Sequence, residues 1–355
     1  MNFQTIFIGT YTEKLPFVDG KAEGIYVCRL NLNSGELVYL SNTVGPRNPS
    51  YLAIDPQQQF IYATQETEVE DDPKVHAWAI DGHTLHPLND QPADGGLPCH
   101  ITVDKTGKFV LSANYETGSI VCYPIRESGL LGEARTLIQH QGSGSCHPRQ
   151  LGPHAHAVVL SADNRLLFVP DLGLDKILIY QFNEETGDLT PSDPAFVKTH
   201  TGAGPRHFVF HPSNRYAFVL NEMDATIIAY AYHNGLLNPL QTVSTLPLDT
   251  SAAPSCAEIA VTPDGRYVYA SNRGHNSIAR FSFEDGQLAK LGHTPTLGET
   301  PRDFAIDLSG KFLIVGNQDT DTVVTFRIDP QTGDLKATGF VAKIPNPVCI
   351  LPVQL

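Results

Sequence analysis

The sequence predicts an all-β protein, a seven-bladed β-propeller whose blades each hold four antiparallel strands. One unit recurs seven times along the 355 residues, and 355 divided by seven is about 51, the length of a propeller blade. The chain also lacks the amphipathic helices of about 10 to 15 residues that connect the strands of a parallel α/β sheet. In addition, its two ends carry complementary halves of one unit. We therefore expect a single domain, residues 1–355.

The first half of each unit is a pair of strands. Residues 205–212 form a run that begins Pro-Arg-His-Phe-Val-Phe, and residues 216–222 follow it across a polar turn. Runs rich in β-branched and aromatic residues, bounded by turn residues, are typical of strands. The same pair recurs at 255–259 with 267–273 and at 301–306 with 312–318, and earlier copies begin at Pro49, Pro98 and near Ala155.

The second half of each unit is a third strand followed by a tight turn. The third runs are residues 25–28, 75–78, 120–123, 177–180, 227–230, 278–281 and 323–326. A glycine that favours a hairpin turn follows each of them. These glycines are Gly35, Gly82, Gly129, Gly187, Gly235, Gly286 and Gly333.

The ends of the chain predict closure of the ring. Residues 5–10 have the pattern of a second strand with no first strand before it, and residues 347–351 have the pattern of a first strand with no second strand after it. Pairing them completes one blade from both ends of the chain and leaves no free sheet edge.

Composition excludes several function classes. The net charge of −14 disfavours nucleic acid and anionic membranes as partners. The apolar stretches are far shorter than the roughly 20 residues that span a bilayer, and the first five residues lack a signal-peptide pattern. The six cysteines form no Cys-x-x-Cys pair, which favours reduced thiols and a cytoplasmic location.

The expected binding site is the mouth of the central channel. Because successive strands run antiparallel, the start of each first strand and the end of each second strand lie at the same rim. Side chains of mixed charge occupy these positions, and a basic focus in an acidic protein favours a small anionic ligand. The alternative is a set of solvated ion pairs such as Arg206 with Glu222. The candidate residues are His156, Arg206, His207, Glu222, Arg273 and Arg302.

Other residues at this rim have weaker signals. The last position of the second strand is asparagine in four blades, which indicates mainly a structural cap, although Asn221 and Asn272 remain candidate substrate contacts together with Tyr11 and Tyr115. The long connections 11–23, 66–73 and 139–153 open on this face, where binding residues are common. The acidic residues of 66–72 are interpreted as a solvated surface run.

The histidines near residue 150 raise the question of a metal. Their spacing follows no zinc-ligand pattern, and the intervening Gly-Ser-Gly-Ser segment is flexible. We therefore expect no metal and no cofactor, with one histidine of this segment acting in catalysis. The residues concerned are His140, Cys146, His147, His154 and His156.

Several motifs resemble the seven-bladed propeller lactonase family, which includes propeller-type 6-phosphogluconolactonases and carboxymuconate cyclases. They are Gly-Pro-Arg-His-Phe-Val-Phe-His-Pro at 204–212 with Leu-Asn-Glu at 220–222, Thr-Pro-Asp-Gly-Arg at 262–266, and Ile-Gly-Thr-Tyr-Thr at 8–12. The resemblance implies catalytic roles for His156, Arg206, Glu222 and Arg273. His154 is a rival for His156, and we also expect substrate contacts from His154, His207 and Arg302.

The resemblance implies hydrolysis of a sugar lactone, first of all 6-phospho-D-glucono-1,5-lactone, and the lack of metal-ligand spacing predicts that the reaction is metal-independent. Either Glu222 or His156 is the base, with arginines for the oxyanion and the phosphate. A lactonizing cyclase and a non-catalytic binding propeller are the alternatives. The expected partner is a small anionic lactone, and the protein is expected to be a monomer or a homodimer.

Overall fold

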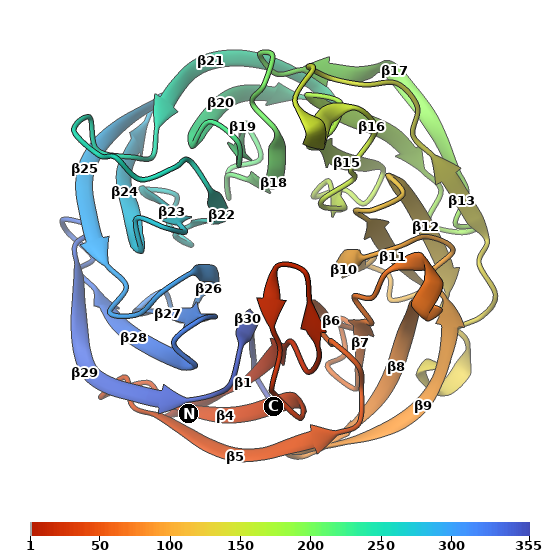
Figure 1. The fold of residues 1–355 in the computed structure, drawn as a ribbon, viewed down its shortest axis with the longest axis horizontal. Coiled ribbons are helices and arrows are strands. Elements are labelled where there is room, and N and C mark those ends of the chain that lie inside the picture. The colour runs from red at the N-terminus through yellow and green to blue at the C-terminus, as the bar shows by residue number, and fades with distance from the viewer. Residues whose placement is uncertain (1) are drawn as a thin grey trace.

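The computed structural model describes residues 2–355 and contains seven four-stranded sheets arranged around a central axis (Figure 1). This is the predicted seven-bladed propeller with four antiparallel strands per blade. A two-stranded hairpin, β2 (Lys14–Leu15) with β3 (Val18–Asp19), projects from the rim toward the axis. The described part of the chain contains no helix long and apolar enough to cross a membrane.

The blades are numbered in chain order, and their strands are given from the axis outward. The first blade holds β30 (Pro347–Val353), β1 (Phe3–Thr10), β4 (Gly24–Asn31) and β5 (Leu37–Val44). The second holds β6 (Leu52–Ile54), β7 (Phe60–Thr64), β8 (Lys74–Asp81) and β9 (Thr84–Pro92). The third holds β10 (Pro98–Val103), β11 (Phe109–Asn114), β12 (Ser119–Pro124) and β13 (Thr136–Gln139).

The remaining blades follow the same order. The fourth holds β14 (Val159–Leu160), β15 (Leu166–Asp171), β16 (Lys176–Phe182) and β17 (Leu189–Lys198). The fifth holds β18 (Pro205–Phe210), β19 (Tyr216–Asn221), β20 (Thr226–His233) and β21 (Leu236–Ser244). The sixth holds β22 (Cys256–Val261), β23 (Tyr267–Asn272), β24 (Ser277–Glu284) and β25 (Gln287–Pro295). The seventh holds β26 (Pro301–Ile306), β27 (Phe312–Asn317), β28 (Thr322–Ile328) and β29 (Leu335–Lys343).

Short 3₁₀ turns lie in three connections. They are η1 (Val69–Asp71), η2 (Glu127–Gly129) and η3 (Pro148–Gln150). Of these, η3 belongs to the long connection between the third and fourth blades, which reaches the channel mouth.

The predicted closure of the ring is confirmed. Strand β30 pairs antiparallel with β1, with Ile350 opposite Ile8 and Val353 opposite Thr5. In Figure 1, β30 lies on the axial side of β1, so the last strand in the chain is the innermost strand of the first blade. The two ends of the chain therefore share one sheet, and the inner edge of β1 is paired.

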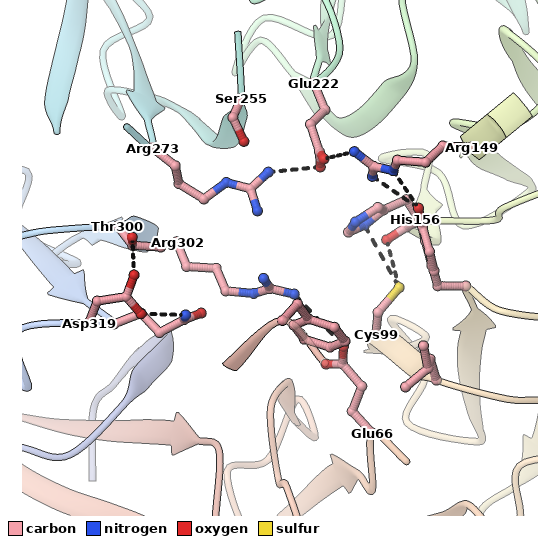
Figure 2. A pocket seen from close by; sticks show the side chains of 14 residues that line it. Glu66, Cys99, Arg149, His156, Glu222, Ser255, Arg273, Thr300, Arg302 and Asp319 are labelled. Atoms are coloured by element: carbon pink, nitrogen blue, oxygen red, sulfur yellow. Dashed lines mark hydrogen bonds and ion pairs between the residues drawn. The ribbon is translucent and has the colours of Figure 1, made fainter. Parts of the chain in front are cut away.

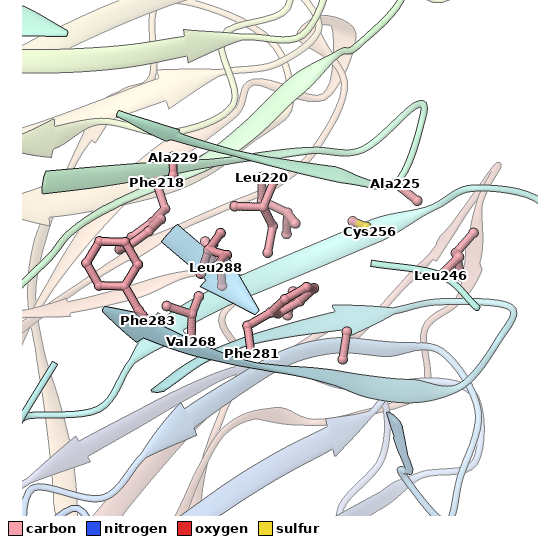
Figure 3. Packing of buried hydrophobic residues seen from close by; sticks show 14 residues of the cluster. Phe218, Leu220, Ala225, Ala229, Leu246, Cys256, Val268, Phe281, Phe283 and Leu288 are labelled. Atoms are coloured by element: carbon pink, nitrogen blue, oxygen red, sulfur yellow. The ribbon is translucent and has the colours of Figure 1, made fainter. Parts of the chain in front are cut away.

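The blades adhere through apolar side chains on both faces of their strands. Figure 3 shows one such interface, where Phe218 and Leu220 of β19 pack with Val268 and Phe281 of the sixth blade. The intervening Val219 faces the opposite way and packs against the fourth blade. Because strand side chains alternate between faces, a strand buried on both sides reads as a continuous apolar run. This rigid ring fixes where each strand end meets the channel.

Candidate active site

A repeated backbone arrangement presents side chains to the channel mouth. In five blades the residue after the second strand donates its N–H to the carbonyl of the residue before the first strand, as Glu222 does to Gly204 (2.8 Å) and Arg273 to Ser255 (2.9 Å). The ladder between β18 and β19 then shifts register around Arg206, and that between β26 and β27 shifts around Arg302. Such bulges change the direction of a side chain. Equivalent backbone positions in different blades can therefore present different side chains at the channel mouth.

The mouth contains a cavity of about 560 Å³. Its lining side chains come from the second to the seventh blades, from the β2–β3 hairpin and from the connection before the fourth blade, and Figure 2 shows them as sticks. Of the predicted site residues, five line this cavity: Tyr115, His156, Glu222, Arg273 and Arg302. Lining residues that the sequence analysis did not propose for the site include Phe17, Glu66, Cys99 and Arg149.

Glu222 is the electrostatic centre of the cavity. Its carboxylate lies 2.7 Å from Arg149 Nη1, 3.1 Å from Arg206 Nε and 2.9 Å from Arg273 Nη2. Burial alone would raise the pKa of Glu222, but the charges of these three arginines hold that pKa well below its usual range. Glu222 is therefore an ionised anchor that gathers guanidinium groups, and it is a poor proton acceptor.

Arg206 lies behind this carboxylate and is absent from the lining of the cavity. Its side chain is 4% exposed, and it donates from Nη1 to the carbonyl of Ala257 as well as pairing with Glu222. The expectation that Arg206 faces the mouth and contacts the substrate directly is thus corrected. The ion pair with Glu222, named in the sequence analysis as the alternative, is present and is buried.

Arg149 is the cavity-lining arginine that sequence reasoning missed. It belongs to η3, and its Nε and Nη2 donate to the Tyr115 hydroxyl at 3.1 and 2.9 Å. The neighbouring Gln150 donates to the carbonyl of Leu172 (2.8 Å), which fixes the turn to the fourth blade. The signal available in the sequence was the length of the 139–153 connection, but that length indicates no particular side chain.

His156 and Cys99 lie side by side in the cavity. The Cys99 sulfur is 3.7 Å from Nδ1 of His156 and 3.5 Å from the His156 carbonyl oxygen. Burial first, and then the nearby charge of Arg206, lowers the pKa of His156 well below its usual value. The imidazole is therefore neutral at pH 7, with its protonation state set by the pocket.

Arg302 enters from the seventh blade. Its guanidinium lies 5.3 Å from the ring centre of Tyr11 and 5.6 Å from that of Phe17, which the β2–β3 hairpin brings to the cavity. Tyr11 is fully buried and supports Arg302 from outside the lining. Glu66 lies 3.8 Å from Arg302 and accepts a hydrogen bond from Ser50. Glu66 is only 4% exposed, so its interpretation as part of a solvated acidic run was wrong.

The comparisons identify the family. A family model described as a lactonase with a seven-bladed β-propeller matches residues 5–352. The chain belongs to this lactonase family.

Several relatives are similar in sequence to this chain over nearly its whole length. A 6-phosphogluconolactonase of Formosa agariphila is 36% identical over 338 residues, covering 93% of this chain and 94% of the relative. A 6-phosphogluconolactonase of Bacillus subtilis is 35% identical and covers 97% of each chain. Among solved structures, a periplasmic gluconolactonase of Pseudomonas aeruginosa has a TM-score of 0.93 at 30% identity and covers 99% of both chains.

Below the cavity of this lactonase-family chain, the channel is filled by a second set of polar side chains. His207 is buried and lies 2.7 Å from Glu258, with its ring edge against His156. His207 is not among the residues that line the cavity. It therefore supports His156 from beneath, and the expectation of a direct substrate contact does not follow from the geometry.

Three further predicted site residues lie outside the cavity lining, in addition to Tyr11, Arg206 and His207. His154 stacks on Tyr115 and contacts its backbone oxygen through Nδ1 at 2.7 Å, and of the two rival histidines it is His156 that lines the cavity. Asn221 donates to Thr226 (2.9 Å) inside its own strand turn. Asn272 is likewise buried in hydrogen bonds to Thr245. Both asparagines have the structural capping role that the sequence analysis favoured.

The histidine-rich segment does not assemble as a metal centre in residues 2–355, where no group of three or more His, Cys, Asp or Glu side chains has that geometry. His140 instead contacts Asp171 at 2.7 Å, with both side chains fully buried. His147 accepts a hydrogen bond from the N–H of Arg149 at the start of η3. These two histidines thus stabilise the connection that carries Arg149.

Proposed function

We propose that this chain hydrolyses a sugar lactone, with 6-phospho-D-glucono-1,5-lactone as the first candidate, and that the reaction needs no metal. The observation that carries the proposal is a neutral, buried imidazole, His156, that shares one cavity with arginines gathered around an ionised carboxylate. This combination supplies a base and fixed positive charge for an ester-type reaction.

His156 is the better of the two candidate bases. A general base must be unprotonated at the working pH and must also hold a proton during the reaction. Glu222 meets the first condition only, because three guanidiniums hold its pKa far below neutrality. The neutral His156 meets both, since a negative charge that develops on the substrate stabilises the imidazolium.

Cys99 supports the required tautomer. Its thiol hydrogen has the His156 carbonyl oxygen as an acceptor at 3.5 Å, which leaves the sulfur to accept the Nδ1 hydrogen of the ring. The lone pair of His156 then lies on Nε2. Cys99 is in this scheme a positioning residue.

The reaction proceeds by addition and elimination. A water oxygen forms a bond to the lactone carbonyl carbon while Nε2 of His156 takes one water proton, and the carbonyl electron pair moves onto its oxygen. Arg149, which is joined through Tyr115 to the His156 side of the cavity, stabilises this oxyanion. The intermediate collapses, the bond to the ring oxygen breaks, and that oxygen takes the proton back from His156. The product is the open-chain hydroxy acid, which ionises.

The choice of sugar lactone rests on the relatives, which are named for 6-phosphogluconolactone in Formosa agariphila and Bacillus subtilis and for gluconolactone in Pseudomonas aeruginosa. The test is pH-stat titration with freshly prepared phosphorylated and unphosphorylated lactone, corrected for spontaneous opening. Acid release should exceed the blank and should fall by roughly 100-fold or more in His156→Gln, the scale of a lost general base. The control His86→Gln alters an exposed histidine outside the site. Acid release no faster than the blank for both lactones would refute the proposal.

For location and assembly we propose a cytoplasmic monomer or homodimer with a small anionic lactone, and neither nucleic acid nor membrane, as its partner. Its six cysteines are free, and five of them are buried, as is usual where thiols stay reduced. The relative from Pseudomonas aeruginosa is a periplasmic gluconolactonase, so the periplasm is the alternative location. Cell fractionation followed by immunoblotting decides between the two.

A further inference from the structure

The β2–β3 hairpin is an element of the mouth that the propeller repeat does not produce. In the third to seventh blades a four-residue turn joins the second strand to the third, as residues 222–225 do in the fifth blade. In the first blade the same connection spans residues 11–23 and carries the hairpin toward the axis (Figure 1). Leu15 pairs with Val18, so the two-residue tip consists of a proline and Phe17. An insertion that a rigid scaffold carries to a channel mouth is a common place for binding residues.

The base of the hairpin is held by contacts on both of its sides. Asn48 Oδ1 accepts a hydrogen bond from the N–H of Glu13 (3.0 Å). The Glu13 carboxylate in turn accepts hydrogen bonds from Nε and Nη2 of Arg47, at 2.7 and 2.9 Å. On the returning side, the N–H of Lys21 donates to Asn346 Oδ1 (3.0 Å). These contacts fix the direction in which the tip points.

Leu15 and Val18 give the hairpin a small apolar core. Both side chains are buried, and they pack on Tyr11 and on Val348 near the start of the innermost strand of the first blade. The ring of Phe17 joins this core from the tip, with its centre 5.8 Å from that of Tyr11 in an edge-to-face arrangement. Apolar packing therefore orders the tip as well as the base.

The ring of Phe17 is only partly covered by the protein. Phe17 is 46% exposed and lines the cavity, where most of the other side chains are polar or charged. Arg302 lies over the ring, with its guanidinium carbon 5.6 Å from the ring centre. Leaving so much of a phenyl ring in water forgoes the free energy gained by burying it. A ligand with an apolar face would recover that gain by covering the free part of the ring.

The ring of a sugar lactone has such a face. Its C–H groups point to the two sides of the ring, and its hydroxyl groups lie mainly around the edge. The face of an aromatic ring carries partial negative charge and attracts C–H hydrogens, while the polar side chains of a pocket bind hydroxyl groups and fix orientation. The open-chain hydroxy acid rotates about its C–C bonds and presents no comparable face.

We propose that the β2–β3 hairpin recognises the closed ring of the substrate, with Phe17 stacking on the C–H face of the sugar. The inference rests on the proposed function for the identity of the sugar lactone, but ring binding itself does not depend on turnover. Hydrolysis opens the ring and so removes this contact from the product. Phe17 thereby favours binding of the lactone over binding of the hydroxy acid, and it promotes product release.

The first experiment compares a closed ring with an open chain. Isothermal titration of the full chain uses D-glucose 6-phosphate, a pyranose without a lactone bond, and D-glucitol 6-phosphate, its open-chain counterpart with the same phosphate. In Phe17→Ala the dissociation constant for glucose 6-phosphate should rise roughly 3- to 10-fold, the scale of one aromatic contact. The constant for glucitol 6-phosphate should not change. An equal loss of affinity for both ligands, or no loss for either, would contradict ring recognition.

Further variants separate stacking from an apolar cover and from a general loss of structure. Phe17→Tyr keeps the aromatic face and should bind glucose 6-phosphate as tightly as the parent, whereas Phe17→Leu keeps only apolar bulk and should bind it more weakly. Full affinity of Phe17→Leu would overturn stacking. Phe196→Ala is the matched control, because Phe196 is also exposed (41%) and lies under a cation, Lys176 at 4.7 Å, but is outside the cavity lining. It should leave both dissociation constants unchanged, and thermal melting verifies that each variant is folded.

The second experiment measures turnover. In Phe17→Ala the KM for the lactone should rise while kcat is retained, because the ring is closed in both the bound substrate and the transition state, and the contact stabilises both equally. Unchanged KM together with unchanged glucose 6-phosphate binding would overturn ring recognition while leaving lactone hydrolysis standing. Selective loss of glucose 6-phosphate binding in Phe17→Ala, in a protein that opens neither lactone, would keep ring recognition and refute the proposed function.

Discussion

Arg149 Nη1 lies 2.7 Å from Glu222 Oε1, so a turn between the third and fourth blades completes a charge cluster that is anchored in the fifth. We expect Arg149→Ala to lower kcat for lactone opening by roughly 100-fold, the usual scale for removing an oxyanion donor. Its side chain is 42% exposed, and Glu222 keeps two other guanidiniums. The melting temperature should therefore change little. Arg135→Ala, which removes an exposed arginine paired with Asp188, is the control and should keep full activity.

Arg206→Ala, unlike Arg149→Ala, should lower the stability of the fold. The residue is 4% exposed, so its removal takes the Nη1 donor away from the buried Ala257 carbonyl and one of three guanidiniums away from the buried Glu222. We expect the free energy of unfolding to fall by about 1.5–3 kcal/mol, as is usual for a lost hydrogen bond to a charged group. Urea denaturation measures this change. A variant that melts like the parent would contradict the structural role assigned to this arginine.

The pH profile should identify the base. Because burial and neighbouring positive charge lower the pKa of His156, the imidazole stays unprotonated as the pH falls through 6.5, the ordinary histidine value. We expect kcat/KM to remain level there and to decline only at more acidic pH. A decline centred at or above pH 6.5 would be inconsistent with this role for His156. Each measurement needs a matched blank, since lactones open spontaneously.

The alkaline side of the profile reports on Arg273. Burial and the charges of Arg206 and Arg302 lower the pKa of Arg273 to about 10, against the opposing pull of Glu222. The guanidinium should thus begin to lose its charge within an accessible pH range. We predict that affinity for glucose 6-phosphate falls as the pH rises through about 10. Constant affinity up to pH 11 would exclude Arg273 as a titrating phosphate ligand.

Chelation should leave the activity intact. Dialysis against EDTA, followed by assay in metal-free buffer, is expected to give the same kcat as the untreated protein, because His156 supplies the base and arginines supply the positive charge. Loss of activity that zinc restores would contradict metal independence. In that case the contact of His140 with Asp171 would be the first to re-examine.

Deleting residues 347–355 should prevent stable folding. These residues include β30, which pairs along β1 and places Val348, Cys349 and Ile350 in buried positions. The loss of a strand ladder and its apolar burial is comparable with a whole domain's stability of about 5–15 kcal/mol. Circular dichroism and solubility measure the outcome. Deletion of Leu355 alone, which lies beyond β30, is the control and should fold normally.

The fold was predictable because it repeats. Seven hairpin glycines and seven apolar runs determine strand number and order, and the unpaired halves at 5–10 and 347–351 determine the closure. Strand register also placed Glu222, Arg273 and Arg302 at the mouth correctly. Equivalent strands of successive blades have the same backbone arrangement, so the position of a residue in one blade can be inferred from its counterpart in another.

The residues that the sequence did not place correctly depend on contacts that the repeat does not determine. Arg149 lies in an irregular connection whose path depends on contacts such as that of Gln150 with Leu172. Glu66 continues into an acidic run, and only the contacts with Ser50 and Arg302 distinguish it from a solvated residue. Arg206 occupies the predicted strand position, but the sequence does not say which side of Glu222 its guanidinium takes.

The pairing of β30 with β1 also governs the order of events during synthesis. Strands β1, β4 and β5 emerge from the ribosome first, and at about 5–20 residues per second the partner for the inner edge of β1 follows only after some tens of seconds. Through that interval the backbone groups of an apolar strand, with Ile6 and Ile8, stay available to other nascent chains. Ring closure therefore protects the inner edge of β1 in the finished protein, but the same edge is open while the chain is being made.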